Sequence, residues 1–181
     1  ASLTPILRST NFIPSPTAIN SCHHAFACGV CQVVLTNFPF NYNNFAELQA
    51  LVDAHDIGVI KMEVSRNRGP EDNFLHKVRQ LATERGIVLI FDECTSGFRQ
   101  TFGGLHKIYG VEPDMAMFGK ALGNGYAITA TIGKREVMEA AQGTFISSTF
   151  WTERIGPTAA LKTLEVMERV KSWESITQTG L

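Results

Sequence analysis

Two short apolar runs, each ending in an ionisable side chain, constrain the fold of this chain more than any other feature. The first reads Gly86-Ile-Val-Leu-Ile-Phe-Asp-Glu93, and the second reads Asp114-Met-Ala-Met-Phe-Gly-Lys120. Neither run has a helical period, which predicts two strands that are buried on both faces. Ligands of open parallel sheets bind beyond the carboxyl ends of the strands. We therefore expect an α/β fold in which Asp92 and Lys120 share one pocket.

Lys120 is surrounded in sequence by small residues, which are Gly119, Ala121, Gly123 and Gly125. A lysine held in this way after a buried strand is a candidate for an amine that forms a covalent bond with a carbonyl group. The alternative is that Lys120 is the first solvated residue after the strand. In the same way, Asp92 is either a functional carboxylate or a polar residue that ends its strand.

Several blocks of the sequence together resemble a known family. They are Phe38-Pro-Phe-Asn-Tyr-Asn43, Val59-Ile-Lys-Met-Glu63, Leu89-Ile-Phe-Asp-Glu-Cys-Thr-Ser-Gly-Phe-Arg99, Tyr109-Gly-Val-Glu-Pro-Asp114, Phe118-Gly-Lys-Ala-Leu-Gly-Asn-Gly125 and Ser147-Ser-Thr-Phe-Trp151. The block around Asp92 and the block around Lys120 are the most specific pair. Both their order and their separation of about two dozen residues match the family. From about residue 29 to about residue 173, the chain resembles the central part of class III pyridoxal-phosphate-dependent aminotransferases. The glutamate-1-semialdehyde 2,1-aminomutase-like branch is the most similar.

The resemblance implies a role for four residues. Lys120 would form a Schiff base with pyridoxal 5′-phosphate, and Asp92 would pair with the nitrogen of the pyridine ring. Cys94 stands where the family usually has a valine or isoleucine packed against the ring. Thr149, or less well Ser148, matches a residue that binds the cofactor phosphate from the neighbouring subunit. A homodimer with a shared active site is therefore expected, and no metal is implied.

The same resemblance implies an enzyme that moves an amino group between an amino donor and a keto or aldehyde acceptor. It does not separate a transaminase (a transferase) from a 2,1-aminomutase (an isomerase). No arginine for a substrate carboxylate is assigned, because Arg99 and Arg154 are each interpreted as solvated or packing residues. Phe150-Trp151-Thr152-Glu153 replaces the Gly-Asn-Pro of many relatives, so the substrate stays open.

Complete members of this family are much longer than 181 residues. We therefore expect a fragment that covers part of the large domain of a fold-type I transferase, with a mostly parallel sheet and flanking helices. Residues 29–181 carry the resemblance, and residues 1–28 have no assignable match. The alternative function is that of a truncated, catalytically silent fragment that binds only the cofactor or a partner.

Composition excludes several other classes of function. Hydrophobic residues make up 44% and charged residues 18%, as in an ordinary globular protein. The 16 basic and 17 acidic residues nearly cancel, which indicates neither a nucleic-acid-binding nor an anionic-membrane-binding surface. The N-terminus shows no signal peptide, so we expect a cytoplasmic location with reduced thiols.

The cysteines Cys22, Cys28 and Cys31 lie close to His23 and His24. A Cys-x-x-Cys pair beside two histidines is compatible with a zinc site or with a redox pair. Both interpretations lack the second ligand pair or the flanking strand–helix–strand unit that such sites use. We interpret these cysteines as small apolar residues without a shared function.

The elements that precede the lysine follow from capping and periodicity. A helix is expected after Asn43-Asn44 and a strand over residues 58–64, with Glu63 near the site or solvated at the end of the strand. Pro70-Glu-Asp72 is expected to open the next helix, and Arg85-Gly86 to close it. The strands on either side of that helix should be parallel.

After the lysine, the sequence predicts a strand and two helices. Residues 126–132 should form a strand antiparallel to the lysine strand, followed by a short helix over residues 135–141. A longer helix is expected over residues 153–172, with a break near Gly156-Pro157. Its expected buried residues are Ala160, Leu164, Met167 and Val170.

Overall fold

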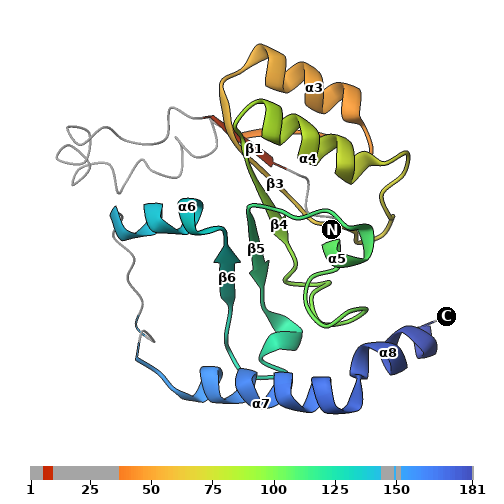
Figure 1. Ribbon diagram of the computed structural model, residues 1–181, viewed down its shortest axis with the longest axis vertical. Helices are drawn as coiled ribbons and strands as arrows, with labels where there is room; N and C mark the ends of the chain where they lie inside the picture. Colours follow the sequence, from red (N-terminus) through yellow and green to blue (C-terminus); the bar gives the residue numbers. More distant parts are fainter. Residues whose placement is uncertain (1–5, 10–36, 144–148, 150–151, 181) are drawn as a thin grey trace.

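The structure is a computed structural model that describes residues 6–9, 37–143, 149 and 152–180 (Figure 1). The cysteine and histidine cluster of residues 22–31 lies outside these residues, and so do Ser148, Phe150 and Trp151. For residues 6–9, the structure describes the backbone. Among the described residues, no helix is long and apolar enough to cross a membrane.

A six-stranded sheet with the strand order β2-β1-β3-β4-β5-β6 forms the centre of the molecule. The strands are β1 (Ile6–Ser9), β2 (Asn37–Pro39), β3 (Ile57–Met62), β4 (Val88–Asp92), β5 (Met115–Phe118) and β6 (Ala130–Gly133). The three central strands β3, β4 and β5 are parallel, whereas the outer pairs are antiparallel. The α/β fold class with a parallel sheet centre and flanking helices is therefore confirmed.

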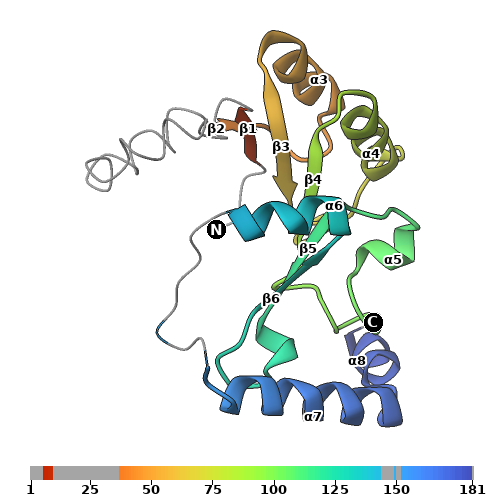
Figure 2. The same cartoon turned by 60° about the vertical axis from the view of Figure 1, so that its left-hand side comes forward.

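Helices lie on the sheet and at its ends (Figures 1 and 2). The α-helices are α3 (Phe45–Ala54), α4 (Phe74–Glu84), α5 (His106–Tyr109), α6 (Arg135–Met138), α7 (Ile155–Val170) and α8 (Ser172–Gly180). Two 3₁₀ helices are η3 (Lys120–Leu122) and η4 (Glu139–Gly143). α3 and α4 lie side by side next to β3 and β4, and α7 lies against η3.

The unit β3-α4-β4 positions the first half of the site. Its two strands are parallel, as expected for a helical crossover. The buried stripe of α4 includes Phe74, Val78 and Leu81, and Arg85 caps its C-terminus before Gly86, which has a positive φ of 66°. Asn44 caps α3 as expected, because its side chain accepts a hydrogen bond from the Glu47 amide at 3.2 Å.

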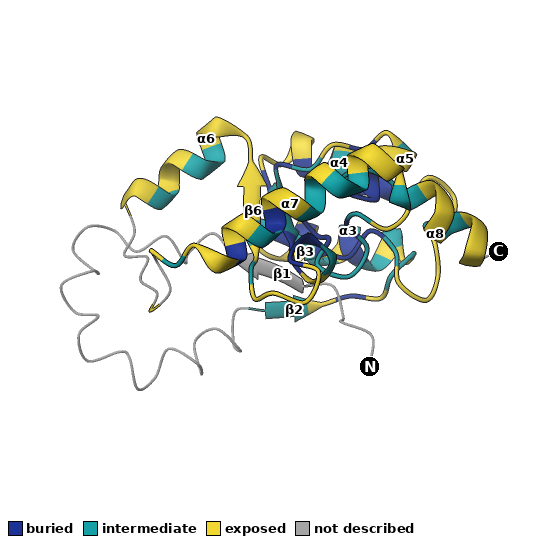
Figure 3. Cartoon of the chain, turned by 90° about the horizontal axis from the view of Figure 1, so that it is seen from below, coloured by how far each residue is buried: buried dark blue, intermediate teal, exposed yellow. Residues whose placement is uncertain are grey.

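Alternation along the strands separates two faces of the sheet. Figure 3 shows buried, dark blue segments in the sheet, for example in β3. Ile60, Met62, Leu89 and Phe91 are fully buried in the main core. The residues between them on the opposite face are only half-buried; they include Val59, Lys61, Val88 and Ile90. The expectation that β4 and β5 are buried on both faces is thus wrong, because alternate residues of both strands are only half-buried. The half-buried face of β3 is the one that carries Lys61.

Four expected element boundaries or burial states differ from the structure. α4 begins at Phe74, because Asp72 and Asn73 take positive φ angles in a turn after Pro70. β6 begins only at Ala130. Pro157 does not break α7, since it lies in the first turn, where a missing N–H costs no hydrogen bond. Val170 is exposed at the last turn of α7.

Candidate active site

The carboxyl ends of β4 and β5 form the candidate site. Asp92 is the last residue of β4 and pairs in register with Met117 of β5. Lys120 begins η3, directly after the end of β5 and Gly119. The Glu93 amide donates a hydrogen bond to the Met117 carbonyl at 2.8 Å, which ties the two strand ends together. Because neighbouring parallel strands end at one edge, the carboxylate and the amine lie at the same edge of the sheet.

The backbone of Lys120 adopts an unfavourable conformation. Its φ is 44°, in the left-handed region that costs a non-glycine residue about 1–2 kcal/mol. The Lys120 carbonyl accepts hydrogen bonds from the amides of Gly123 and Asn124, both at 3.1 Å, and these bonds hold the turn. The Lys120 Nζ donates to Thr95 Oγ1 at 2.7 Å. Such strain, held by surrounding bonds, is typical of functional sites.

Asp92 is buried, with 8% of its surface exposed, and both of its oxygens are engaged. Oδ2 accepts from Lys61 Nζ at 2.7 Å, and Oδ1 accepts from the amide of Cys94 at 3.2 Å. Burial raises the pKa of the carboxyl group, but the hydrogen bonds from Lys61 and Cys94 outweigh burial and lower it overall. Asp92 is therefore ionised at neutral pH.

Glu63 and Cys94 lie next to this pair of strand ends. Burial raises the pKa of Glu63, while Arg66, at 3.6 Å, opposes the rise and the charge of Asp92 adds to it. Burial also raises the pKa of the Cys94 thiol, with Asp92 again adding to the rise. The charge of Lys120 lowers the pKa of both groups. The ends of β3, β4 and β5, which carry Glu63, Asp92 and Lys120, are therefore electrostatically coupled.

Glu93, directly after Asp92, faces away from this cluster. It is fully buried and accepts hydrogen bonds from the amide and Nδ1 of His106, at 3.0 and 2.9 Å, and from the hydroxyl of Ser96. Burial raises the pKa of Glu93, but the bonds from His106 and Ser96 lower it overall. Glu93 therefore holds the loop between β4 and α5 in place.

Two residues that contact the predicted pair were not found from the sequence. Thr95 contacts Lys120, and Lys61 contacts Asp92. The signal for Lys61 was a charged residue inside the apolar run of β3, two positions before Glu63. Thr149, which is predicted to bind the cofactor phosphate, is exposed in a turn between η4 and α7.

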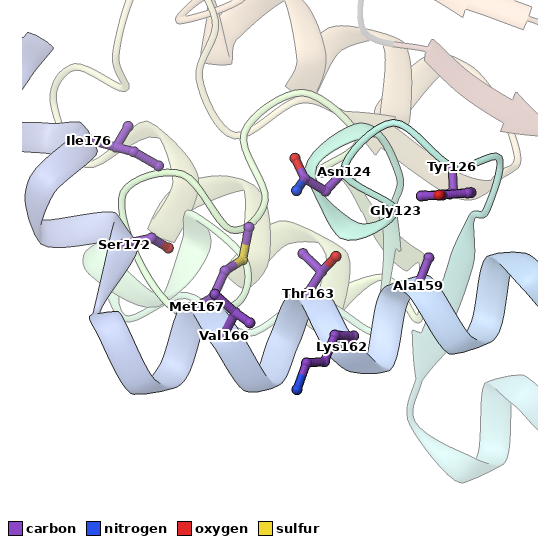
Figure 4. Close-up of a pocket in the computed structure, with 10 residues that line it drawn as sticks. All are labelled: Gly123, Asn124, Tyr126, Ala159, Lys162, Thr163, Val166, Met167, Ser172 and Ile176. Atoms are coloured by element: carbon purple, nitrogen blue, oxygen red, sulfur yellow. The ribbon is translucent and has the colours of Figure 1, made fainter.

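Two hollows among the described residues lie near the end of β5 but do not include the candidate pair. A cavity of about 470 Å³ lies between the turn after Lys120 and the helices α7 and α8 (Figure 4). Its lining includes Asn124, Tyr126, Thr163 and Met167. An apolar cavity of about 690 Å³ lies beside β5 and β6. Neither cavity is lined by Lys120 or Asp92, so the chemistry of the side chains identifies the site, not the shape of the surface.

Comparison with known proteins gives consistent matches over most of the chain. The family model described as aminotransferase class-III matches residues 67–180. The chain is 40% identical over 152 residues to the 3-aminobutyryl-CoA aminotransferase of Cloacimonas acidaminovorans, covering 79% of this chain and 37% of that protein. It is 36% identical over 152 residues to the glutamate-1-semialdehyde 2,1-aminomutase of Nitrosopumilus maritimus, covering 80% and 36%.

A solved structure is also similar. It is the FumI protein of Sphingopyxis sp. MTA144 in its PLP internal aldimine form, with a TM-score of 0.68 and 28% identity. The similarity covers 71% of this chain and 33% of that protein. The chain thus spans about a third of the length of the relatives that it matches.

Proposed function

The chain belongs to the class III aminotransferases, and from this we propose that it carries the pyridoxal-phosphate site of an enzyme that transfers an amino group. One observation carries the proposal. An ionised carboxylate, Asp92, ends β4, and a strained, exposed lysine, Lys120, follows the end of the neighbouring parallel strand β5 at the same edge of the sheet. The 3-aminobutyryl-CoA aminotransferase and the 2,1-aminomutase that resemble this chain support the reaction class.

The donor set fits pyridoxal 5′-phosphate at two of its three anchoring points. An aldehyde needs an amine that is not already paired with an acid, and Lys120 contacts the neutral hydroxyl of Thr95. A pyridine nitrogen that carries a proton needs an ionised acceptor, and Asp92 is one. For the phosphate we propose the hydroxyl of Thr149, acting from a second copy of the chain.

Lys120 would perform two tasks. When bound, pyridoxal phosphate supplies an aldehyde for covalent attachment and an aromatic ring that withdraws electrons. Lys120 would attach through its Nζ. Once an incoming amine has released it, the Nζ would take the proton from the substrate Cα and would deliver it to the C4′ carbon of the cofactor. Arginine could not do this, since its guanidinium group does not lose its proton.

The other residues of the site would orient and tune these groups. Asp92 would keep a proton on the ring nitrogen, because an ionised carboxylate stabilises the positively charged ring. Thr95 holds the Nζ of Lys120 in position. Cys94, half-buried beside Gly119, would contact the face of the ring as a small apolar group.

The substrates proposed are an amino donor and a keto or aldehyde acceptor. A transaminase releases a keto product before the second half-reaction, whereas a 2,1-aminomutase returns the amino group to the same carbon chain. Lys120 and Asp92 serve both reactions. Amino-group transfer to an added keto acid, followed by chromatography, separates them, because only the transaminase needs an external acceptor.

A second candidate function rests on the length of the chain. Because the chain spans about a third of its relatives, it is also compatible with a cofactor-binding fragment that has no turnover. Such a fragment would bind pyridoxal phosphate at Lys120 without moving the substrate proton. Exchange of the Cα proton of an amino acid in D₂O, followed by NMR, distinguishes the two functions.

The experiment that tests the site is reduction with borohydride in the presence of pyridoxal phosphate, followed by peptide mapping. We expect the label on Lys120 and its loss in Lys120→Ala. Lys162→Ala, a matched control that removes an exposed lysine from the cavity of Figure 4, should keep the label. Label on Lys162 or Lys61 in place of Lys120, or no label, would refute the assignment.

A further inference from the structure

Lys61 lies in the site although the sequence pattern does not predict it there. It is in β3 and pairs in register with Ile90, so its side chain lies on the same face as Asp92, two residues further along β4. Its Nζ donates to Asp92 Oδ2 at 2.7 Å, and 38% of the side chain is exposed. A lysine inside a strand of apolar residues, with its amine on the buried carboxylate, is a specific arrangement.

The carboxylate of Asp92 has no oxygen without a donor. The amide of Cys94 donates to Oδ1, and Lys61 donates to Oδ2. The Cys94 amide is part of the backbone turn that follows β4. A protonated ring nitrogen that approaches Asp92 therefore shares its carboxylate with Lys61, whichever of the two oxygens it contacts.

We propose that Lys61 is a positioning residue that shares Asp92 with the ring nitrogen of the cofactor and weakens the hold of that nitrogen on its proton. The proposal rests on the proposed function and deepens it. The ammonium group fixes the orientation of Asp92 before the cofactor binds. In the loaded site it places a positive charge beside the ring nitrogen, and a nearby like charge disfavours the protonated form of that nitrogen.

The other ionisable groups near Asp92 do not supply the positive charge that Lys61 places next to its carboxylate. Glu63 is the second acid and is paired with Arg66 at 3.6 Å. Lys120 is the second amine, and its Nζ donates to Thr95. The Cys94 thiol has a raised pKa, so it is neutral at pH 7. Lys61 is the cation that the structure places in direct contact with the Asp92 carboxylate.

Pyridoxine 5′-phosphate is a suitable probe, because it has the ring of the cofactor with an alcohol in place of the aldehyde. It forms no covalent bond with Lys120, and the ultraviolet absorption of its ring reports protonation of the nitrogen. The bound probe is titrated in the wild-type chain, Lys61→Met and Lys61→Arg. Lys134→Met is the matched control, since Lys134 makes an ion pair of the same 2.7 Å length with Asp114 at the other end of β5.

We expect the nitrogen of the bound probe to protonate at a higher pH in Lys61→Met, by on the order of one pH unit. Lys61→Arg and Lys134→Met should titrate like the wild type. In the chain without cofactor, ¹³C NMR should show a higher pKa for Asp92 in Lys61→Met. Lys61→Gln, which is also neutral, takes the place of Lys61→Met if circular dichroism shows that the methionine variant is unfolded.

An unchanged or lower protonation pH in the neutral variants would overturn the proposal, even if the Asp92 titration moves. Binding of the probe without such a change would leave the proposed function intact, because labelling of Lys120 by borohydride tests that function separately. Failure of the wild-type chain to bind the probe would overturn the proposal for Lys61, and it would overturn the proposed function only if borohydride reduction with pyridoxal phosphate also leaves Lys120 unlabelled.

Discussion

At the scale of single residues, the site contains two amines that differ in their partners. Lys61 donates to the carboxylate of Asp92, and Lys120 donates to the hydroxyl of Thr95. To form a bond with an aldehyde, an amine must give up its protons and its hydrogen-bond acceptor. If Lys61 reacted, it would leave Oδ2 of the buried Asp92 carboxylate without its donor, which costs more than a lost contact with a hydroxyl. This difference in partners supports the proposal that Lys120, and not Lys61, is the covalent residue.

The proposed role of Asp92 predicts that its replacement affects proton transfer at the substrate Cα more than attachment of the cofactor to Lys120. In Asp92→Asn, the label at Lys120 after borohydride reduction should persist at saturating pyridoxal phosphate. Exchange of the substrate Cα proton should fall by roughly 10²–10³-fold, since a neutral amide does not stabilise the protonated ring. Peptide mapping and NMR in D₂O measure the two effects. Full exchange in Asp92→Asn would remove the assigned role.

At the scale of elements, Asp114 joins four of them. Its Oδ2 accepts from Arg79 Nη1 of α4 and from the Leu89 amide of β4, both at 2.8 Å. Its Oδ1 accepts from Lys134 Nζ, between β6 and α6, at 2.7 Å. Asp114 itself precedes β5. Burial raises the pKa of this carboxyl group, but the bonds from Leu89, Lys134 and Arg79 lower it overall.

This cluster predicts a pH-dependent stability. A lowered pKa in the folded state means that the stabilisation is present above the unfolded value of about 4 and is lost as the pH falls through the folded value. Asp114→Asn should lower the free energy of unfolding by about 2 kcal/mol at pH 7. In urea titrations, the difference from the wild type should shrink below about pH 4.

Asp53→Asn is the control for this prediction. Asp53 also makes an ion pair with an arginine, Arg85, but both side chains are about half exposed. Its replacement should change the stability by less than about 1 kcal/mol at pH 7. A difference between Asp114→Asn and the wild type that stays constant down to pH 2 would contradict the role of the charge.

The turn that follows Lys120 depends on close approach of the backbone. A Cβ atom at Gly123 would lie 2.1 Å from the Tyr126 carbonyl oxygen and 2.8 Å from the side chain of Ile128. Gly123→Ala should therefore lower the free energy of unfolding by about 3 kcal/mol. It should also reduce labelling of Lys120, since the Gly123 amide bonds to the Lys120 carbonyl.

Gly143→Ala provides the comparison for this turn. A Cβ atom at Gly143 of η4 meets nothing within 4 Å. Thermal and urea unfolding should show a change of no more than about 1 kcal/mol, and labelling should be unchanged. Equal effects of the two substitutions would contradict the steric argument.

At the scale of the whole molecule, the described residues leave the site open to solvent at Lys120. Lys120 is exposed, and the sheet face around Lys61 is only half-buried in the part of the chain that the structure describes. A cofactor at the carboxyl ends of β4 and β5 would thus need further groups to cover it. We propose that Thr149 of a second copy of the chain is one of these groups, because Thr149 is exposed and is therefore accessible to another subunit.

Mixing two variants tests this shared site. Thr149→Ala should bind pyridoxal phosphate about tenfold more weakly, as expected for a lost hydrogen bond to a charged group. Lys120→Ala should not be labelled at all. In a mixture, a site with Lys120 from one copy and Thr149 from the other is intact, so labelling at low cofactor concentration should recover.

The readout is the mass-spectrometric yield of labelled peptide, with Thr152→Ala as a control for another exposed threonine in the same segment. No recovery in the mixture, together with weak binding by Thr149→Ala alone, would place Thr149 in its own site and would contradict the shared arrangement.

Much of the local structure could be predicted from residues close together in sequence. The cap of α3 at Asn44, the stripe of α4 and the end of α4 at Gly86 each depend on neighbours within a few residues. The predicted start of α4 is wrong, because Asp72 and Asn73 have positive φ angles and form a turn where the first turn of the helix is expected. The predicted break of α7 at Pro157 is wrong, because a proline interrupts the hydrogen bonds of a helix only beyond its first turn.

The sequence by itself determined the class of fold and the candidate pair Asp92 and Lys120, because apolar runs and motif spacing are local properties of the chain. The tertiary structure alone decided which groups surround that pair. Lys61 contacts Asp92, and Thr95 contacts Lys120, because pairing between strands sets which residues share a face and a height. Such register depends on contacts between distant residues, and no local pattern encodes it.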